Sequence, residues 1–153
     1  MPRQARLIIK DACYHIITRG NQKQDILKER DDYYAYLGLL SKYKKRFDSK
    51  IYSFCLMSNH VHLVIESSML NKFMHGVNLS YAQHFKYKYK TIGHFWQDRY
   101  KSFAILKDNY ILSCIEYNPV RAKIVSSPMD YPWSSYKFRV LGKSNVLLDP
   151  LVL

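Results

Sequence analysis

The chain has 153 residues, which is enough for one domain with a hydrophobic core and too few for two domains of ordinary size. Hydrophobic residues make up 48% of the sequence, and only 5 Gly and 5 Pro occur, which excludes a disordered or collagen-like chain. Lys and Arg number 24 against 12 Asp and Glu, and the resulting net charge of +12 favours a polyanionic partner such as nucleic acid. We expect a single domain over residues 1–153, with an N-terminal arm over about residues 1–10 and a C-terminal extension over about residues 125–153.

Membrane insertion and secretion are not expected. No uninterrupted apolar stretch approaches the roughly 18 residues of a membrane span, and the N-terminal segment lacks a long apolar core and a small-residue cleavage site. The cysteines, Cys13, Cys55 and Cys114, are odd in number and form no CxxC pair, so neither a disulfide scaffold nor a zinc ribbon is indicated. These features predict a cytoplasmic protein.

The first half of the chain alternates strand and helix patterns. Cys13–Thr18 is short, β-branched and aromatic, and a turn at Arg19-Gly20-Asn21 follows it. Apolar residues at helical spacing predict a helix over Asp31–Phe47. Ile51–Met57 and His60–Glu66 then predict a hairpin around a two-residue turn.

The second half continues the same pattern. A helix is expected over Asn71–Tyr89, a fourth strand within Phe95–Ile105, and a further helix over Asp108–Tyr117 that Asn118-Pro119 interrupts. In the first of these segments apolar residues recur at four-residue steps, at Phe73, Val77, Tyr81 and Phe85. The order of elements predicts an α+β ferredoxin-like sandwich, with an antiparallel sheet of four to five strands and helices packed on one face.

The chemistry-bearing pattern is the pair His60 and His62. Alternate strand residues share a face, with Cα atoms roughly 6.7 Å apart, so two imidazoles can bind one ion. By itself, however, such a pair is more often two ordinary surface histidines. A third ligand is also needed, and a hard divalent ion prefers oxygen. Asn118 offers an amide oxygen, although an Asn before Pro is also typical of a plain helix end.

Six blocks of the sequence together resemble the IS200-like single-tyrosine transposases of the HUH superfamily, in particular the relatives associated with repetitive extragenic palindromes. They follow the order found in that family and span nearly the whole chain. The blocks are Pro2-Arg3-Gln4-Ala5-Arg6; Tyr14-His15 with Arg19-Gly20-Asn21; Cys55-Leu56-Met57-Ser58-Asn59-His60-Val61-His62-Leu63; Phe95-Trp96-Gln97-Asp98-Arg99-Tyr100-Lys101; Asn118-Pro119-Val120-Arg121-Ala122; and Tyr131-Pro132-Trp133-Ser134-Ser135-Tyr136.

The resemblance implies metal-assisted transesterification of single-stranded DNA, usually beside a hairpin. In that family two histidines and an Asn or Gln hold Mg²⁺ or Mn²⁺, which maps here to His60, His62 and Asn118. A tyrosine attacks the phosphate and stays joined to the 5′ phosphate, which leaves a free 3′ hydroxyl and conserves the energy of the broken bond. Insertion-sequence members act as dimers that exchange tyrosine helices, whereas palindrome-associated relatives can be monomers, so a homodimer is possible.

The sequence departs from the family at the nucleophile. The family tyrosine stands four residues before the metal-binding Asn, and that position is Cys114 here. Alignment from Arg99-Tyr100-Lys101-Ser102 instead places the tyrosine at Tyr117, with about three residues missing before Asn118. Adjacent residues are rotated by about 100° on a helix, so Tyr117 and Asn118 need a break in the helix to serve one site. We predict Tyr117 as the nucleophile, with Tyr110 as a more distant alternative.

The expected DNA contacts are basic residues that stand near aromatic residues. Such charges anchor phosphates, while bases are recognised by stacking and by hydrogen bonds to unpaired edges. The predicted residues are Arg3, Arg6, Arg19, Lys23, Lys86, Lys88, Lys90, Arg99, Lys101 and Arg121.

Two other functions fit the same residues. One is a hairpin-binding protein that has kept the basic surface and lost the nucleophile. The other is RNA binding, which predicts that an RNA hairpin competes at least as well as DNA of the same sequence.

Overall fold

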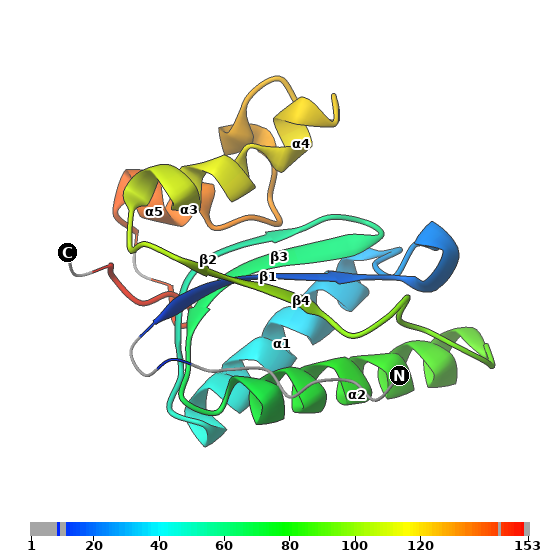
Figure 1. Ribbon diagram of the computed structural model, residues 1–153. Coiled ribbons are helices and arrows are strands. Elements are labelled where there is room, and N and C mark those ends of the chain that lie inside the picture. The colour runs from blue at the N-terminus through cyan, green and yellow to red at the C-terminus, as the bar shows by residue number, and fades with distance from the viewer. Residues whose placement is uncertain (1–8, 10–11, 144, 152–153) are drawn as a thin grey trace.

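Four strands form one antiparallel sheet in the order β2-β3-β1-β4 (Figure 1). This computed structural model describes residue 9, residues 12–143 and residues 145–151. The strands are β1 (Cys13–Arg19), β2 (Lys50–Leu56), β3 (His60–Glu66) and β4 (Lys101–Ile105). The strand order and the antiparallel pairing are those of the ferredoxin-like sandwich predicted from the sequence.

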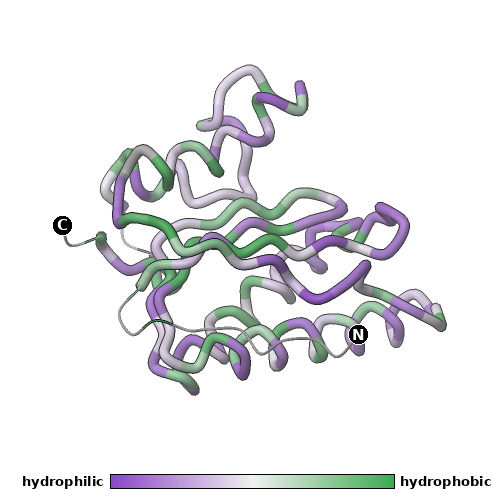
Figure 2. Tube along the Cα trace, in the orientation of Figure 1, coloured by the Kyte–Doolittle hydropathy of each residue, from purple (hydrophilic) through white to green (hydrophobic). Residues whose placement is uncertain are grey.

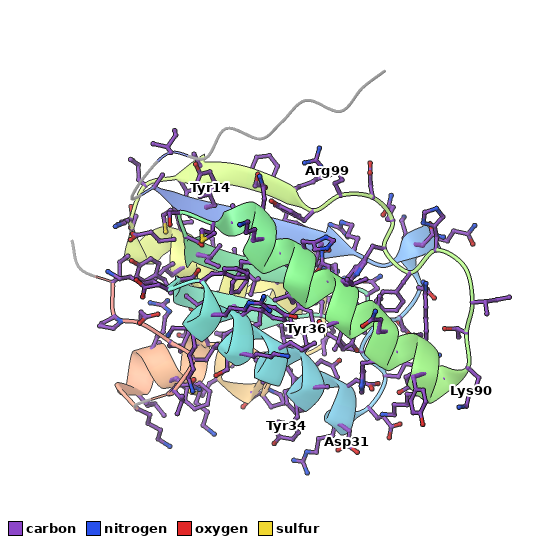
Figure 3. The ribbon with its side chains drawn as sticks, turned by 90° about the horizontal axis from the view of Figure 1, so that it is seen from below. Tyr14, Asp31, Tyr34, Tyr36, Lys90 and Arg99 are labelled. Atoms are coloured by element: carbon purple, nitrogen blue, oxygen red, sulfur yellow. The ribbon has the colours of Figure 1, made fainter. Side chains whose placement is uncertain are left out.

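Two long helices, α1 (Arg30–Arg46) and α2 (Leu70–Tyr89), lie side by side across one face of the sheet, as the sequence predicted (Figures 1 and 3). The C-terminal part of the chain forms a second group of helices on the other side of the sheet (Figure 1). The shorter elements are η1 (Asn21–Lys23), α3 (Asn109–Glu116), α4 (Asn118–Arg121), η2 (Pro128–Asp130) and α5 (Tyr136–Leu141).

Local sequence accounts for the two long helices. A capping box starts α1, in which the Glu29 side chain accepts from a backbone N–H of the first turn and the Asp32 side chain accepts from the backbone N–H of Glu29. The four-residue repeat predicted for α2 is confirmed, because Phe73, Val77, Tyr81 and Phe85 are all buried. Among the described helices, none is long and apolar enough to cross a membrane.

The main core lies between the sheet and these two helices. Strand alternation sends Tyr14 and Ile16 of β1 and Val61, Leu63 and Ile65 of β3 into it. Figure 2 shows hydrophobic residues along the central strands and hydrophilic residues in the loop where β1 leads into η1.

The opposite face of the sheet is apolar at one end and polar at the other. At the first end, Cys13, Tyr52 and Val64 pack against Leu112 and Ile115 of α3. Further along the same face come the histidines of β3 and the last residues of β1, where exposure rises. The packing of α3 therefore leaves one half of this face for a site.

The predicted break in the last helix is present at Tyr117. This residue lies between the end of α3 and the start of α4, so Asn118 starts a separate short helix with Pro119 in its first turn. The elements η2 and α5 were not predicted from the sequence, because this part of the chain was expected only as an extension.

Candidate functional site: a histidine pair beside a basic cavity

The two histidines of β3 share one face of the sheet, as their spacing predicted. Their ring centroids are 4.9 Å apart, with the rings edge to face. His62 is 7% exposed and lies opposite Ile17 of β1, and His60 is half-buried and lies opposite Arg19. The pair therefore sits where the covered part of this face gives way to its exposed end.

Hydrogen bonds hold Nδ1 of each ring. His60 Nδ1 lies 2.6 Å from the side-chain oxygen of Asn59, and His62 Nδ1 lies 2.9 Å from Nε2 of His15. Since a bound metal ion needs one free ring nitrogen per histidine, these contacts leave the two Nε2 atoms as ligands.

The surroundings also keep both rings neutral. Burial, together with the positive charge of Arg19, lowers the pKa of His60 to about 4. Burial, with the neighbouring His60 and His15, lowers the pKa of His62 to about 3. Neutral imidazole is the form that binds a metal ion, so the pair fits a divalent cation over the whole neutral range of pH.

The predicted third ligand, Asn118, already uses both ends of its amide group in hydrogen bonds. Asn118 uses its side-chain oxygen to accept from Arg121 Nη2 at 3.2 Å, and its side-chain nitrogen donates to the Ile115 carbonyl at 2.8 Å. Across the part of the chain that the structure describes, no group of three His, Cys, Asp or Glu side chains could hold an ion. A third donor must therefore be a group of another kind, such as an amide oxygen or an oxygen of the substrate.

Tyr117 lies at the joint between α3 and α4 and is 38% exposed. Its ring meets the ring of Tyr136 edge-on, with centroids 5.7 Å apart, and a hydrogen bond with Tyr117 raises the pKa of Tyr136. In the described part of the molecule Tyr117 makes no hydrogen bond or ring contact with His60 or His62. The structure therefore does not bring the predicted nucleophile onto the histidine pair.

The two alternatives to Tyr117 lie further back on α3. Cys114 is partly buried, and its carbonyl accepts from Arg121. Tyr110 lies in the first turn of α3, and its side chain is outside the described part of the chain.

An ion pair fixes the end of α3 that leads into Tyr117. The carboxylate of Glu116 is completely buried and accepts from Arg139 of α5, with Nε 2.9 Å from Oε2 and Nη2 2.6 Å from Oε1. Ser135 also donates to Glu116, and Arg139 Nη2 donates to Ser113 at 3.2 Å. The C-terminal extension thus holds the helix that carries the predicted nucleophile.

Four of the predicted DNA-binding residues meet in one cavity of about 500 Å³. The cavity is lined by Ile17, Arg19, Lys23, Gln97, Asp98, Arg99 and Lys101. Because Arg19 pairs with His60 across β1 and β3, the cavity adjoins the histidine pair. Arg121 lies near the pair as well, since its charge also lowers the pKa of His62.

The lysines of α2 are placed differently, because α2 covers the opposite face of the sheet (Figure 1). Lys88 forms ion pairs with Glu29 and Asp32, and Lys90 lies over the Tyr87 ring. Figure 3 shows Lys90 at the C-terminal end of α2, away from Arg99. Lys86 lines a second hollow of about 640 Å³, together with Arg99. Arg3 and Arg6 lie outside the described residues.

Sequence reasoning did not assign a role to His15, Asn59, Glu116 or Arg139. The motif blocks contain His15 and Asn59, and alternation along β1 puts His15 on the same face as Arg19. The contact of His15 with His62 depends on the register between β1 and β3, which the sequence does not give directly. The pairing of Glu116 with Arg139 has no comparable signal, because these residues are 23 positions apart.

The site is thus an HxH pair on the partly open face of a ferredoxin-like sheet. Residues 8–117 match the family described as "Transposase IS200 like", and the chain therefore belongs to that family of DNA transposases. Members of this family generally use a divalent metal ion.

Two solved structures share the fold. One is described as a REP-associated tyrosine transposase bound to a REP hairpin; it is 18% identical, with a TM-score of 0.74, and the match covers 97% of this chain and 92% of the other. The second is a putative transposase from Deinococcus radiodurans R1, 12% identical, with a TM-score of 0.53 and coverage of 93% and 98%. A search of the curated proteins found no match.

Proposed function

We propose that this chain is a metal-dependent endonuclease and strand transferase that cleaves single-stranded DNA beside a hairpin through a 5′-phosphotyrosine intermediate. The observation that carries the proposal is the histidine pair, whose Nδ1 atoms are both held by neighbours and whose cross-strand partners Ile17 and Arg19 line a basic cavity. Membership of a transposase family supports the substrate class, and a fold neighbour described as bound to a REP hairpin supports the hairpin.

Each part of the site has a separate role in this proposal. Arg19, Lys23, Arg99 and Lys101 bind phosphates of the strand and place it beside the histidines. His60, His62 and Asn118 would hold Mg²⁺ or Mn²⁺. Such an ion, when bound, withdraws charge from the phosphate that is cleaved.

Arg121 donates to the side-chain oxygen of Asn118 and places a positive charge beside it, which disfavours a second cation at that oxygen. A guanidinium group binds phosphate strongly, so an incoming strand offers Arg121 a competing partner. Binding of DNA and completion of the ligand set are therefore linked.

The covalent step uses Tyr117. The phenol gives its proton to water, its oxygen forms a bond to phosphorus, and the bond from phosphorus to the 3′ oxygen breaks. That oxygen takes up a proton and becomes a free 3′ hydroxyl, and rejoining is the reverse reaction. Tyr136 keeps its own proton, because its pKa is raised, and can donate to the Tyr117 oxygen.

The tyrosine acts in its own chain in this proposal. Leu112 and Ile115 bury α3 against the sheet of the same chain, and the Glu116–Arg139 pair joins it to α5. The three free cysteines fit a reducing compartment, so we place the activity in the cytoplasm.

A binding-only function is the second candidate, and one observation favours it. Cys114 stands at the family position of the nucleophile, and among the described residues Tyr117 makes no hydrogen bond or ring contact with the histidine pair. In this case the basic cavity binds a hairpin and no strand is cut.

End-labelled hairpins with degenerate single-stranded flanks test the proposal in Mg²⁺, in Mn²⁺ and in EDTA. We expect metal-dependent cleavage that Tyr117→Phe abolishes while hairpin binding persists. Tyr87→Phe is the matched control, because Tyr87 is 81% exposed and lies on α2. Tight binding that falls steeply with salt, with no cleavage by any sample, supports the binding-only function. An RNA hairpin that competes as well as DNA contradicts a DNA-specific site.

A further inference from the structure

We propose that His15 is a positioning residue, which fixes the tautomer and the orientation of His62 so that Nε2 of His62 faces a ligand. The link to a metal ion rests on the proposed function above. The effect of His15 on the tautomer of His62 does not rest on the proposed function, because this tautomer can be measured in metal-free protein.

His15 is held in place by both of its neighbouring strands. It lies on β1, half-buried, with Val64 of β3 on one side and Phe103 of β4 on the other as cross-strand partners. Its ring centroid is 5.2 Å from that of His62 at an interplanar angle of 26°, and 6.3 Å from that of Phe103. The end-to-end hydrogen bond between the two rings limits rotation of both imidazoles.

The contact between the two rings contains one proton. Nε2 of His15 and Nδ1 of His62 are 2.9 Å apart, so one nitrogen donates and the other accepts. If His62 donates from Nδ1, its Nε2 carries a lone pair and can bind a cation. If His15 donates instead, Nε2 of His62 carries the proton and cannot bind one.

The neighbouring histidine indicates which direction applies. The atom of Asn59 that contacts Nδ1 of His60 is the side-chain oxygen, which can only accept, so His60 carries its proton on Nδ1 and presents Nε2. The same assignment at His62 makes the two rings equivalent, with both Nε2 atoms as ligands and both Nδ1 atoms as donors to a neighbour. His15 then accepts the Nδ1 proton of His62, as the side-chain oxygen of Asn59 accepts the Nδ1 proton of His60.

Two substitutions separate hydrogen bonding from packing. His15→Phe keeps a flat ring against Phe103 and His62 but cannot accept a hydrogen bond. His15→Gln loses the ring but can place an amide oxygen near the position of Nε2. His75→Phe is the control, because His75 is exposed on α2, across the sheet from the site.

Long-range ¹H–¹⁵N spectra of metal-free protein report the tautomer of each histidine. We expect His62 to carry its proton on Nδ1 in the wild type, in His15→Gln and in His75→Phe. In His15→Phe we expect a shift toward the Nε2–H form, which neutral imidazole side chains favour in water. A proton on Nε2 of His62 in the wild type overturns the proposal, as does an unchanged tautomer in His15→Phe.

A Mn²⁺ titration followed by electron paramagnetic resonance gives the second measurement. We expect the affinity to fall about 10–100-fold in His15→Phe and to recover in His15→Gln, while thermal melting confirms that both variants fold. If the tautomer responds as expected but the wild type binds no Mn²⁺, the role of His15 is supported and the metal site of the proposed function is refuted. If the wild type binds Mn²⁺ and His15→Phe binds it equally well, His15 does not position the ligand.

Discussion

The ion pair between Glu116 and Arg139 is expected to dominate the stability of the C-terminal half. Arg139→Met removes the charged partner and keeps most of the apolar stem of the side chain. The Glu116 carboxylate, which has no exposure, is then left with the hydroxyl of Ser135 as its remaining side-chain partner among the described residues. A buried charge without its counter-ion is strongly destabilising.

The structure sets the size of the effect. Arg139 makes two close contacts with the carboxylate and is only 17% exposed, so solvent screens the pair weakly. Breaking such a pair costs about 3–5 kcal/mol, whereas a surface pair contributes about 0–1 kcal/mol.

Urea unfolding followed by circular dichroism measures this change in the free energy of unfolding. Lys143→Met is the matched control, because Lys143 is exposed beyond the end of α5 and its replacement removes one positive charge, as Arg139→Met does. The double variant Glu116→Gln with Arg139→Met should recover part of the loss. A loss below about 1 kcal/mol in Arg139→Met, equal to that of the control, would refute the reasoning.

Three further predictions concern the core. Asp32→Asn should lower the free energy of unfolding by about 3 kcal/mol at pH 7, because the buried carboxylate accepts several hydrogen bonds. These hydrogen bonds outweigh burial and hold the pKa of Asp32 well below its usual range. In urea unfolding curves the difference in stability from the wild type should therefore narrow as the pH falls below about 4. Burial raises the pKa of Cys13 to about 11 and of Cys55 to about 12, so both should resist iodoacetamide at pH 8 until the protein unfolds, and peptide mass spectrometry showing rapid labelling contradicts this. Gly76→Ala should lower the free energy of unfolding by about 1–3 kcal/mol, since a Cβ there meets the ring of Tyr43; an unchanged urea midpoint shows that the ring moves aside freely.

Periodicity predicted most of the fold. The four-residue repeat in Asn71–Tyr89 identifies the buried face of α2, and this face is buried as expected. The alternation in His60–Glu66 identifies the face of β3 that enters the main core, and this face is also buried. The strand order follows from the element order, because few topologies suit this pattern. The short helices after residue 117 were not predicted, since each is held by tertiary contacts such as the Glu116–Arg139 pair.

The site was predicted only in part. The spacing of His60 and His62 sufficed to place both rings on one face, because alternation along a strand is a local property. The partner of His62 was not predictable in this way, because His15 reaches it through the register of another strand. Lys88 was predicted to bind DNA because of its charge. In the structure its ammonium group donates to the buried carboxylate of Asp32, which lies 56 positions earlier.

The most direct test of the account is to look for a covalent protein–DNA adduct. The purified chain is incubated with hairpin single-stranded DNA and Mn²⁺ or Mg²⁺, denatured, and digested for peptide mass spectrometry, with a His60→Ala sample alongside. We predict a 5′-phosphotyrosine on Tyr117 that needs the metal ion and is absent from the His60→Ala sample. An adduct on Tyr110 or Cys114, or hairpin binding with no adduct under any of these conditions, would contradict it.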